Sequence, residues 1–369
     1  MLEQQAGPTG WEIIGDSPKP GELRLWAYQA IAHGADGMVF FRWRTCRFGN
    51  EEYWHGVLDH HGIPGRRYIE IARVGDELKR IGDQIKGSVT LSQIAIMQSY
   101  DTRFGFQTQQ NNPQFSYEAH IHDIYRGFFA QHIGVDVVSE MDSLTGYKVV
   151  IVPSMYLLSE ETSSNLAEFA RAGGIVVFTP RTGVKDGVNA VVDARLPGLA
   201  AEMCGVEVDE YKSLPPDDQD TIHFNLPGQE GNFVVSVWSE TLEIHGAEVI
   251  ASYQRDEFAG KPAITRNSFG EGQVIYIGVF SDYRFYEHLA HWLLSEVQIK
   301  APLAASPGVE VTERWQGDQR LLFLLNHNNQ SQPIRLNGEL IDLISGDKVS
   351  GLVHLGAKDV MILKISSGK

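Results

Sequence analysis

The chain has 369 residues, enough for two or three domains that each bury a core of their own. Its net charge of −16 argues against nucleic acid or an anionic membrane as a partner, because both attract basic surfaces, and it favours a neutral or cationic ligand. No apolar run approaches the roughly 18 residues that span a bilayer, and no signal peptide pattern is visible. Cys46 and Cys204 are too few and too far apart for a disulfide framework or a metal site, so we expect a reducing cytoplasm.

The first eleven residues carry the most chemistry. A short apolar approach ends in the carboxylate of Glu3, followed by two amides, a Gly-Pro turn and the indole of Trp11. We interpret this order as a strand end at the mouth of a carbohydrate site, where amides bind hydroxyls and an indole packs on a sugar ring. The alternative interpretation is an exposed acid in a fraying N-terminus.

Residues 1–88 predict the tail of a β/α barrel. A helix is expected over residues 22–33, ended by Gly34, and a fully apolar strand over residues 38–41 is typical of a parallel strand buried on both sides. Residues 66–86 predict a strongly amphipathic helix. These elements make the last two units of a barrel that needs about 250 residues. We therefore expect a partial sequence, with a truncated gene or a second polypeptide that completes the barrel as alternatives.

Residues 89–303 alternate strands and helices, which is typical of a parallel sheet covered on both faces. Residues 207–270 are expected to be irregular or antiparallel. Strands are predicted over residues 93–97, 135–138, 148–153, 174–179 and 274–278, and helices over residues 117–133, 160–172, 196–204 and 285–297.

Residues 304–369 alternate apolar and polar side chains between turns rich in Asn, Gly and Asp. This pattern predicts a small antiparallel β-sandwich. Exposed aromatic residues are few there, so we expect a structural cap rather than a carbohydrate-binding module.

Several further motifs follow the opening segment at characteristic distances. These are Pro20-Gly21-Glu22-Leu23-Arg24-Leu25-Trp26, His33-Gly34-Ala35-Asp36-Gly37, Phe40-Phe41-Arg42-Trp43-Arg44 and Tyr53-Trp54-His55-Gly56. Taken in this order, the chain resembles the C-terminal portion of glycoside hydrolase family 42, the β-galactosidases. The resemblance implies the end of a catalytic TIM barrel, a trimerisation domain similar to flavodoxin and glutamine amidotransferases, and a C-terminal β-domain. It also implies a homotrimer and retaining hydrolysis of β-galactosides without a cofactor.

The resemblance assigns roles to five residues. Glu3 matches the family nucleophile, Trp11 and Phe41 match positions that line the galactose subsite, and Glu51 and His55 match ligands of sugar hydroxyls. Departures in the last loop leave the choice between Glu51 and Glu52 open. The alternative for Trp11 and Phe41 is core packing. The general acid/base belongs to barrel segments outside this match, so we expect the chain alone to be inactive.

Other motifs of the sequence give less support to a specific chemical role. Arg42 and Arg44 are expected either to pair with active-site acids or to cap the barrel. The loop cluster His55, Asp59, His60 and His61 lacks the helical spacing of zinc sites, so no metal is expected. The turn Thr179-Pro180-Arg181-Thr182-Gly183 lacks the thiol of an amidotransferase, and Cys204 is interpreted as a buried apolar residue.

Two further functions remain as alternatives to a β-galactosidase. The chain is also compatible with a non-catalytic assembly module that trimerises through its middle domain. A small-molecule site in that domain is less favoured, because no Gly-rich phosphate loop follows its first strand. The segment Ser99–Phe104 is interpreted as a contact with the barrel or with a neighbouring subunit.

Overall fold

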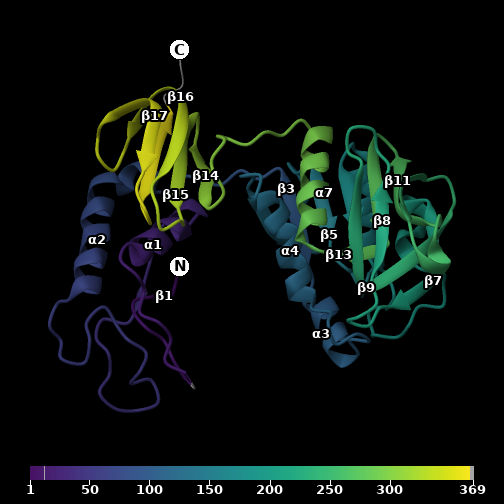
Figure 1. The fold of residues 1–369 in the computed structure, drawn as a ribbon, viewed down its shortest axis with the longest axis horizontal. Coiled ribbons are helices and arrows are strands. Elements are labelled where there is room, and N and C mark those ends of the chain that lie inside the picture. Colours follow the sequence, from purple (N-terminus) through teal and green to yellow (C-terminus); the bar gives the residue numbers. More distant parts are fainter. Residues whose placement is uncertain (12, 366–369) are drawn as a thin grey trace. The chain divides into compact units, whose positions relative to one another are not determined.

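The computed structural model describes residues 1–11 and 13–365, drawn as a ribbon in Figure 1. The chain divides into two compact units. Unit 1 comprises residues 1–91, 132–134 and 301–369, and unit 2 comprises residues 92–131 and 135–300. Within the described residues, no helix has the length and apolar character needed to cross a membrane.

Unit 1 begins with two consecutive parallel β-α units. Strand β1 (Gln4–Gln5) pairs in parallel with β2 (Phe40–Phe41), and a backbone hydrogen bond from the Val39 amide to the Met1 carbonyl extends the ladder. Helix α1 (Glu22–Ala32) connects the two strands, and α2 (Arg66–Ile85) follows a long loop. The bounds of both helices agree with the prediction to within one residue. The first strand differs from our prediction, because Glu3 precedes β1 instead of ending it.

The C-terminal strands form one antiparallel sheet of five strands in the order β14-β15-β18-β16-β17. The antiparallel arrangement is confirmed, although the strands belong to one continuous sheet rather than two. A bulge between Leu336 and Leu340 bends β16, so only its end pairs with β18. The strands are β14 (Val309–Gln316), β15 (Gln319–Asn326), β16 (Gln332–Asp342), β17 (Lys348–Leu355) and β18 (Val360–Ile365).

One face of this sheet shares a hydrophobic core with α1 and α2. Leu25, Tyr28 and Ile31 of α1 and Ile81 of α2 pack in the same cluster as Phe323 of β15. Helix α1 is therefore buried on more than one side, which explains why its buried residues exceed the single stripe expected for a surface helix. Residues from both ends of the sequence thus build one core.

Unit 2 is centred on a parallel sheet with the strand order β4-β3-β5-β6-β12. Strands β5 and β6 consist entirely of buried apolar residues, as expected where helices cover both faces. The predicted strands are confirmed to within two residues. They are β3 (Ile94–Gln98), β4 (Val135–Ser139), β5 (Val149–Val152), β6 (Ile175–Phe178) and β12 (Gly272–Ile277).

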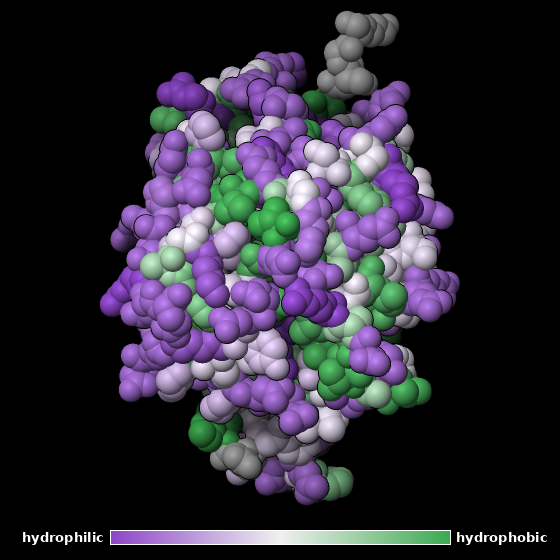
Figure 2. Space-filling view, turned by 90° about the vertical axis from the view of Figure 1, so that its right-hand side faces the viewer, coloured by the Kyte–Doolittle hydropathy of each residue, from purple (hydrophilic) through white to green (hydrophobic). Residues whose placement is uncertain are grey.

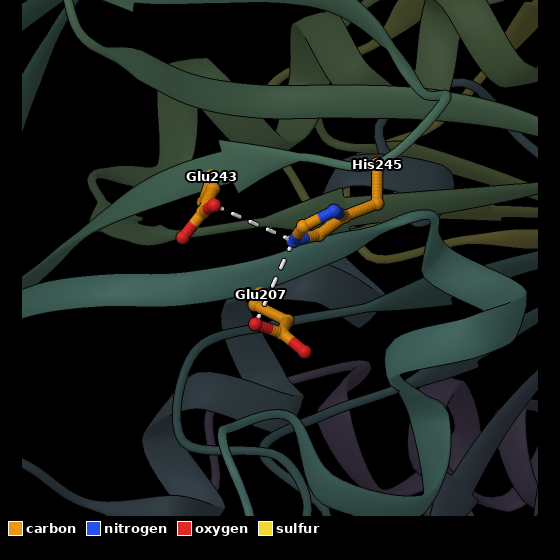
Figure 3. Close-up of side chains that lie close together, drawn as sticks. All are labelled: Glu207, Glu243 and His245. Carbon is orange, nitrogen blue, oxygen red and sulfur yellow. Dashed lines mark ion pairs between the residues drawn. The ribbon is translucent and has the colours of Figure 1, made fainter.

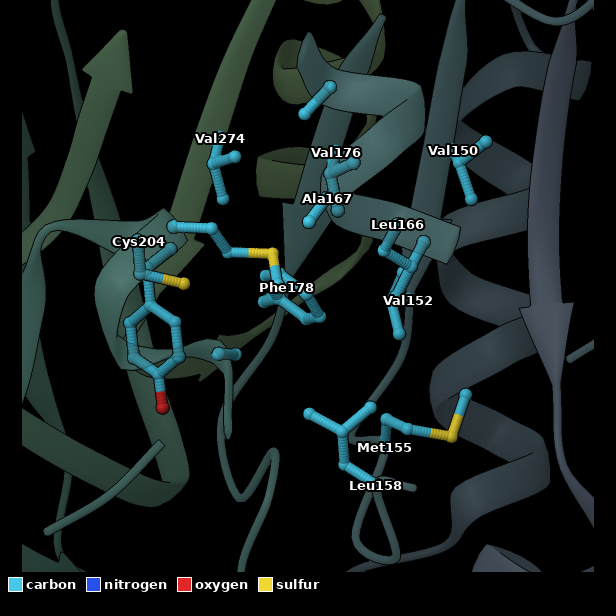
Figure 4. Packing of buried hydrophobic residues seen from close by; sticks show 14 of the residues in the cluster. Val150, Val152, Met155, Leu158, Leu166, Ala167, Val176, Phe178, Cys204 and Val274 are labelled. Atoms are coloured by element: carbon cyan, nitrogen blue, oxygen red, sulfur yellow. The ribbon is translucent and has the colours of Figure 1, made fainter. Parts of the chain in front are cut away.

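Five α-helices accompany this sheet in the described part of unit 2. Leu166 and Ala167 of α5 pack with Phe178 and Cys204 in the core that Figure 4 shows. The helix expected over residues 196–204 is shorter, because Gly198 has a φ of 59°, outside helical geometry. The helices are α3 (Tyr100–Thr108), α4 (Tyr117–Phe129), α5 (Glu160–Arg171), α6 (Ala201–Cys204) and α7 (Tyr283–Glu296), with 3₁₀ turns at Gly198–Ala200 and Asp256–Phe258.

Beyond β12 the sheet continues with antiparallel strands, in the order β12-β11-β10-β8-β9-β13, and β7 pairs with β9. On the side that carries β7 and β11, the surface is largely hydrophilic, with hydrophobic residues in separate groups (Figure 2). The strands are β7 (Val206–Ser213), β8 (Asp220–Phe224), β9 (Gly231–Ile244), β10 (Glu248–Tyr253), β11 (Pro262–Phe269) and β13 (Val279–Ser281).

Candidate active site

Three of the five candidate residues, Trp11, Glu51 and His55, lie in the loops that follow β1 and β2. Glu3 lies just before β1, and Phe41 ends β2. Because the two strands are parallel, their carboxyl ends lie at the same edge. In β/α barrels this edge carries the catalytic groups. Glu3 is exposed and makes no hydrogen bond or ion pair with another described residue.

The two amides after Glu3 differ in their surroundings. Gln4 is buried, and Gln5 donates from Nε2 to the Gly7 carbonyl at 2.8 Å. Gly7 itself lies against the last loop, since a Cβ on it would approach the Cβ of His55 to 2.8 Å. The first loop therefore needs glycine at this position to pack against the segment that contains His55.

An aromatic group joins the two loops. The Trp11 ring lies 5.5 Å from the ring of Trp54, and the Phe41 ring lies 6.3 Å from it in an edge-to-face arrangement. Trp11 remains 67% exposed, so its outer face is available to a ligand. Trp54 is a central member that sequence reasoning did not select. Its position in the Tyr53-Trp54-His55-Gly56 motif was the available signal.

Two backbone carbonyls orient the imidazole of His55. Its Nδ1 lies 3.1 Å from the Tyr53 carbonyl and 3.3 Å from the Pro8 carbonyl. Since a carbonyl only accepts, Nδ1 carries the proton and donates. The Nε2 atom, which has no partner among the described residues, can then exchange a hydrogen bond with a hydroxyl group.

Arginines organise the last loop. Arg42 forms an ion pair with Glu51, and its guanidinium lies 4.4 Å from the centre of the Phe41 ring. Arg44 instead donates to the His60 carbonyl, at 2.6 Å from Nη2. Arg42 thus pairs with a candidate site acid, which is one of the two roles considered for these arginines. Arg44 holds the loop through the His60 carbonyl, and its contacts test neither role.

Glu51 and Glu52 differ in their contacts. The Glu51 carboxylate is held by Arg42, whereas the Glu52 carboxylate has no hydrogen bond or ion pair within the described residues. Only the backbone carbonyl of Glu52 is engaged, by Nε2 of His60 at 2.8 Å. A free carboxylate can accept from a sugar hydroxyl without first breaking an ion pair.

The side chains of the histidine-rich loop do not come together as a set of metal ligands. Asp59 pairs with Arg67, and His60 is bound to the Glu52 backbone. In the described chain, candidate metal ligands come together only in unit 2, where Glu207, Glu243 and His245 lie close together (Figure 3). Strands β7 and β9 place these two glutamates opposite one another.

An arginine already lies between the two carboxylates of this trio and offsets part of their charge. Nη1 of Arg195 lies 3.1 Å from Glu207 and 2.5 Å from Glu243, and these carboxylates raise the pKa of Arg195. Nε2 of His245 lies 3.5 Å from Glu207. The group is best described as an exposed ion-pair network across two strands, where like charges would otherwise repel.

The turn after β6 is filled by protein side chains. The Arg181 guanidinium donates to the Gln110 carbonyl at 2.8 Å and lies 4.7 Å from the Trp238 ring. Burial lowers the pKa of Arg181 and raises the pKa of the Cys204 thiol. Cys204 is fully buried and Cys46 is partly exposed, and both are free thiols. The turn after β6, residues 179–183, contains no cysteine.

Three segments of the chain match known domain families. Residues 1–81 match a family described as beta-galactosidase, residues 92–303 the beta-galactosidase trimerisation domain, and residues 308–364 the beta-galactosidase C-terminal domain.

Curated relatives match over nearly the whole chain. The beta-galactosidase LacZ of Heyndrickxia coagulans is 31% identical over 99% of this chain, and BgaB of Geobacillus sp. is 30% identical over 99%. The chain spans about half the length of these relatives, 54% in both cases, and corresponds to their C-terminal portion.

Solved structures agree with this assignment. The crystal structure of a beta-galactosidase from Bacillus circulans sp. alkalophilus matches with a TM-score of 0.95 and 31% identity, covering 99% of this chain and 55% of that one. Gan42B, a GH42 beta-galactosidase from G. stearothermophilus, matches with a TM-score of 0.93 and 28% identity, covering 98% and 53%.

Proposed function

Because the chain belongs to the glycoside hydrolase family 42 β-galactosidases, we propose that it provides the nucleophile half of a retaining β-galactosidase active site. Glu3 would attack the anomeric carbon and form a covalent galactosyl-enzyme intermediate. The observation that carries the proposal is the aromatic contact between the two loops at the edge where β1 and β2 end. There the ring of Trp54 contacts the rings of both Trp11 and Phe41.

The surrounding residues would bind the sugar. Trp11 offers an exposed indole face to the galactose ring, and Phe41 supports it through Trp54. His55 presents Nε2 to a hydroxyl group, while its Nδ1 is held by carbonyls. Glu51 is proposed as the second polar ligand, held in place by Arg42, with Glu52 as the alternative.

A retaining mechanism requires a second carboxyl group about 5–5.5 Å from the nucleophile. We propose that this general acid/base, together with the remaining barrel strands, comes from polypeptide outside residues 1–369. The open edges of the β1–β2 pair support this, because two strands do not close a barrel. The substrate would be a β-galactoside, and the chemistry requires no cofactor.

The test uses a chimera in which residues 1–369 replace the matching portion of the Heyndrickxia coagulans enzyme, beside the chain alone. We expect hydrolysis of a nitrophenyl β-galactoside by the chimera only. Glu3→Gly should abolish it, and added azide should restore turnover by giving a galactosyl azide of inverted configuration. An active chimera that keeps its turnover after Glu3→Gly would refute Glu3 as the nucleophile.

The same chimera separates the two candidate acids. If Glu51 binds a hydroxyl group, Glu51→Gln should raise KM and lower kcat/KM about tenfold or more, since a charged hydrogen bond contributes roughly 1.5–3 kcal/mol. Glu52→Gln is the matched control one residue away. The reverse pattern would assign the role to Glu52 and leave Glu51 as a loop anchor.

A second function, a non-catalytic assembly module, is favoured by the match of residues 92–303 to a trimerisation domain. We propose that the chain forms a homotrimer in either case. Light scattering on the purified chain tests this directly, because a stable monomer at all concentrations would refute it.

The two free thiols, Cys46 and Cys204, support the proposal of a reducing, cytoplasmic setting.

A further inference from the structure

Asn337 and Gly338 lie in a bulge of β16. Between the paired residues Leu336 and Leu340, residues 337–339 have no partner in the register with β17. Strand β18 does not pair with these three residues either, because it meets only the end of β16. Within the described residues, no neighbouring strand therefore fixes the peptide that joins Asn337 to Gly338.

The side chain of Asn337 is also unrestrained. It is exposed and makes no hydrogen bond with another described residue. Gly338 is exposed as well, and a Cβ on it would meet no other atom within 4 Å. Because glycine has no side chain, nothing on Gly338 shields its own backbone nitrogen. The carboxamide carbon of Asn337 and the nitrogen of Gly338 can therefore turn toward one another.

Asn267 provides the opposite case. It also precedes a small residue, Ser268, but both residues are paired with β12. The Asn267 side chain donates from Nδ2 to the Met203 carbonyl at 2.9 Å. The carboxamide and the following peptide are thus both held in place. In the whole sequence, Asn337 is the only asparagine that directly precedes a glycine.

We propose that Asn337 is a site of spontaneous deamidation in the folded protein, independent of the sugar site. The Gly338 nitrogen forms a bond to the side-chain carbonyl carbon of Asn337, and the bond from that carbon to Nδ2 breaks. Ammonia leaves with the proton that the Gly338 nitrogen gives up. Water then opens the cyclic imide at either carbonyl, which leaves aspartate or isoaspartate at residue 337. The product carries one more negative charge.

The bulge accommodates this product. Leu336 is buried in an apolar cluster of the sheet, but the Asn337 side chain points to solvent and has no hydrogen bond within the described residues to lose. Isoaspartate adds one carbon to the main chain, at a place where β16 already carries unpaired residues. We therefore expect the modification to accumulate on folded chains.

The experiment incubates the full chain at mildly alkaline pH, where the Gly338 nitrogen loses its proton more readily, both natively and in urea. Mass spectrometry follows the peptides that contain Asn337 and Asn267, because replacement of NH2 by OH raises the mass of each. A fixed backbone slows such local reactions. We expect the native rate to lie within about threefold of the rate in urea at Asn337, but at least about tenfold below it at Asn267. Equal protection of the two asparagines would refute the proposal.

Asn337→Gln is the matched control, because the longer side chain would have to close a larger ring and reacts much more slowly. Isoelectric focusing of the incubated native chain should show a new acidic band in the parent and not in the variant. An equal band in both would place the reaction at another residue and refute Asn337. Circular dichroism of the acidic band should match the parent, and a loss of native signal would refute the accommodation by the bulge.

Discussion

Arg314 of β14 links the C-terminal sheet to the ends of both helices of unit 1, and its removal should destabilise that unit selectively. Its side chain is fully buried. The guanidinium donates to the carbonyls of Ile31, Ala35 and Ser88, at 2.8, 3.1 and 2.5 Å, and to Asp36 at 2.7 Å. One cation thus satisfies carbonyl groups just beyond α2 and at the end of α1, where a helix leaves acceptors without intrahelical donors.

The proposed change is Arg314→Met, which keeps an unbranched side chain of similar length but removes every donor. Replacing both members of a buried ion pair with apolar residues can be neutral, but here the carbonyls and Asp36 remain. Leaving them without a cation should cost about 3–5 kcal/mol. For a unit of this size, that lowers the unfolding midpoint by about 6–20 °C.

Differential scanning calorimetry of the whole chain is the assay, and unit 2 serves as an internal reference. The control is Arg320→Met on the neighbouring strand, where a partly exposed arginine pairs with Glu313. An exposed pair contributes only about 0–1 kcal/mol. If Arg314→Met shifts the transition of unit 1 no more than Arg320→Met does, the guanidinium is not the link that we infer.

Two further predictions concern Glu310 and the thiols. Burial alone would raise the pKa of Glu310, but hydrogen bonds from His327 and His33 outweigh it and lower the pKa to about 2, from 4.5. A depressed pKa stabilises the fold above the unfolded value, so about 3 kcal/mol should be lost as the pH falls from about 4.5 to 2. Urea unfolding of Glu310→Gln should show a flatter decline over this range, and an acid limb identical to the parent's would contradict the assignment. Ellman's reagent should react with one thiol in the native chain, Cys46, and with Cys204 only in denaturant; rapid reaction of the Cys46→Ser variant would refute the burial argument.

Elements with a strong local pattern were predictable from the sequence. Helix α2 repeats apolar residues at three- and four-residue spacing, which indicates a helix with one buried face. Strands β5 and β6 are short, uninterrupted apolar runs, which are typical of strands buried on both faces. Helix α3 was not predicted. The sequence signal for this helix was its N-cap. The Ser99 side chain accepts a hydrogen bond from the Thr102 amide at the start of the helix.

The candidate site was predictable residue by residue but not as an arrangement. The sequence pointed to Trp11, Phe41 and His55, but the ring contacts that bring Trp11 and Phe41 together pass through Trp54. Residues 11 and 54 are far apart in the sequence, and no periodicity encodes such a contact. The commitment of Arg42 to Glu51 and of Arg44 to the His60 carbonyl likewise depends on how the last loop folds.

The shared core of unit 1 has a consequence for the proposed chemistry. The loops that carry Trp11 and His55 are joined to α1 and α2, and these helices pack on strands more than 200 residues later in the chain. Arg24 of α1 pairs with Glu77 of α2 at 2.8 Å and with Asp359, next to β18, also at 2.8 Å. The C-terminal sheet therefore acts as a scaffold for the proposed sugar site, and its loss would loosen the site without removing any residue that contacts the substrate.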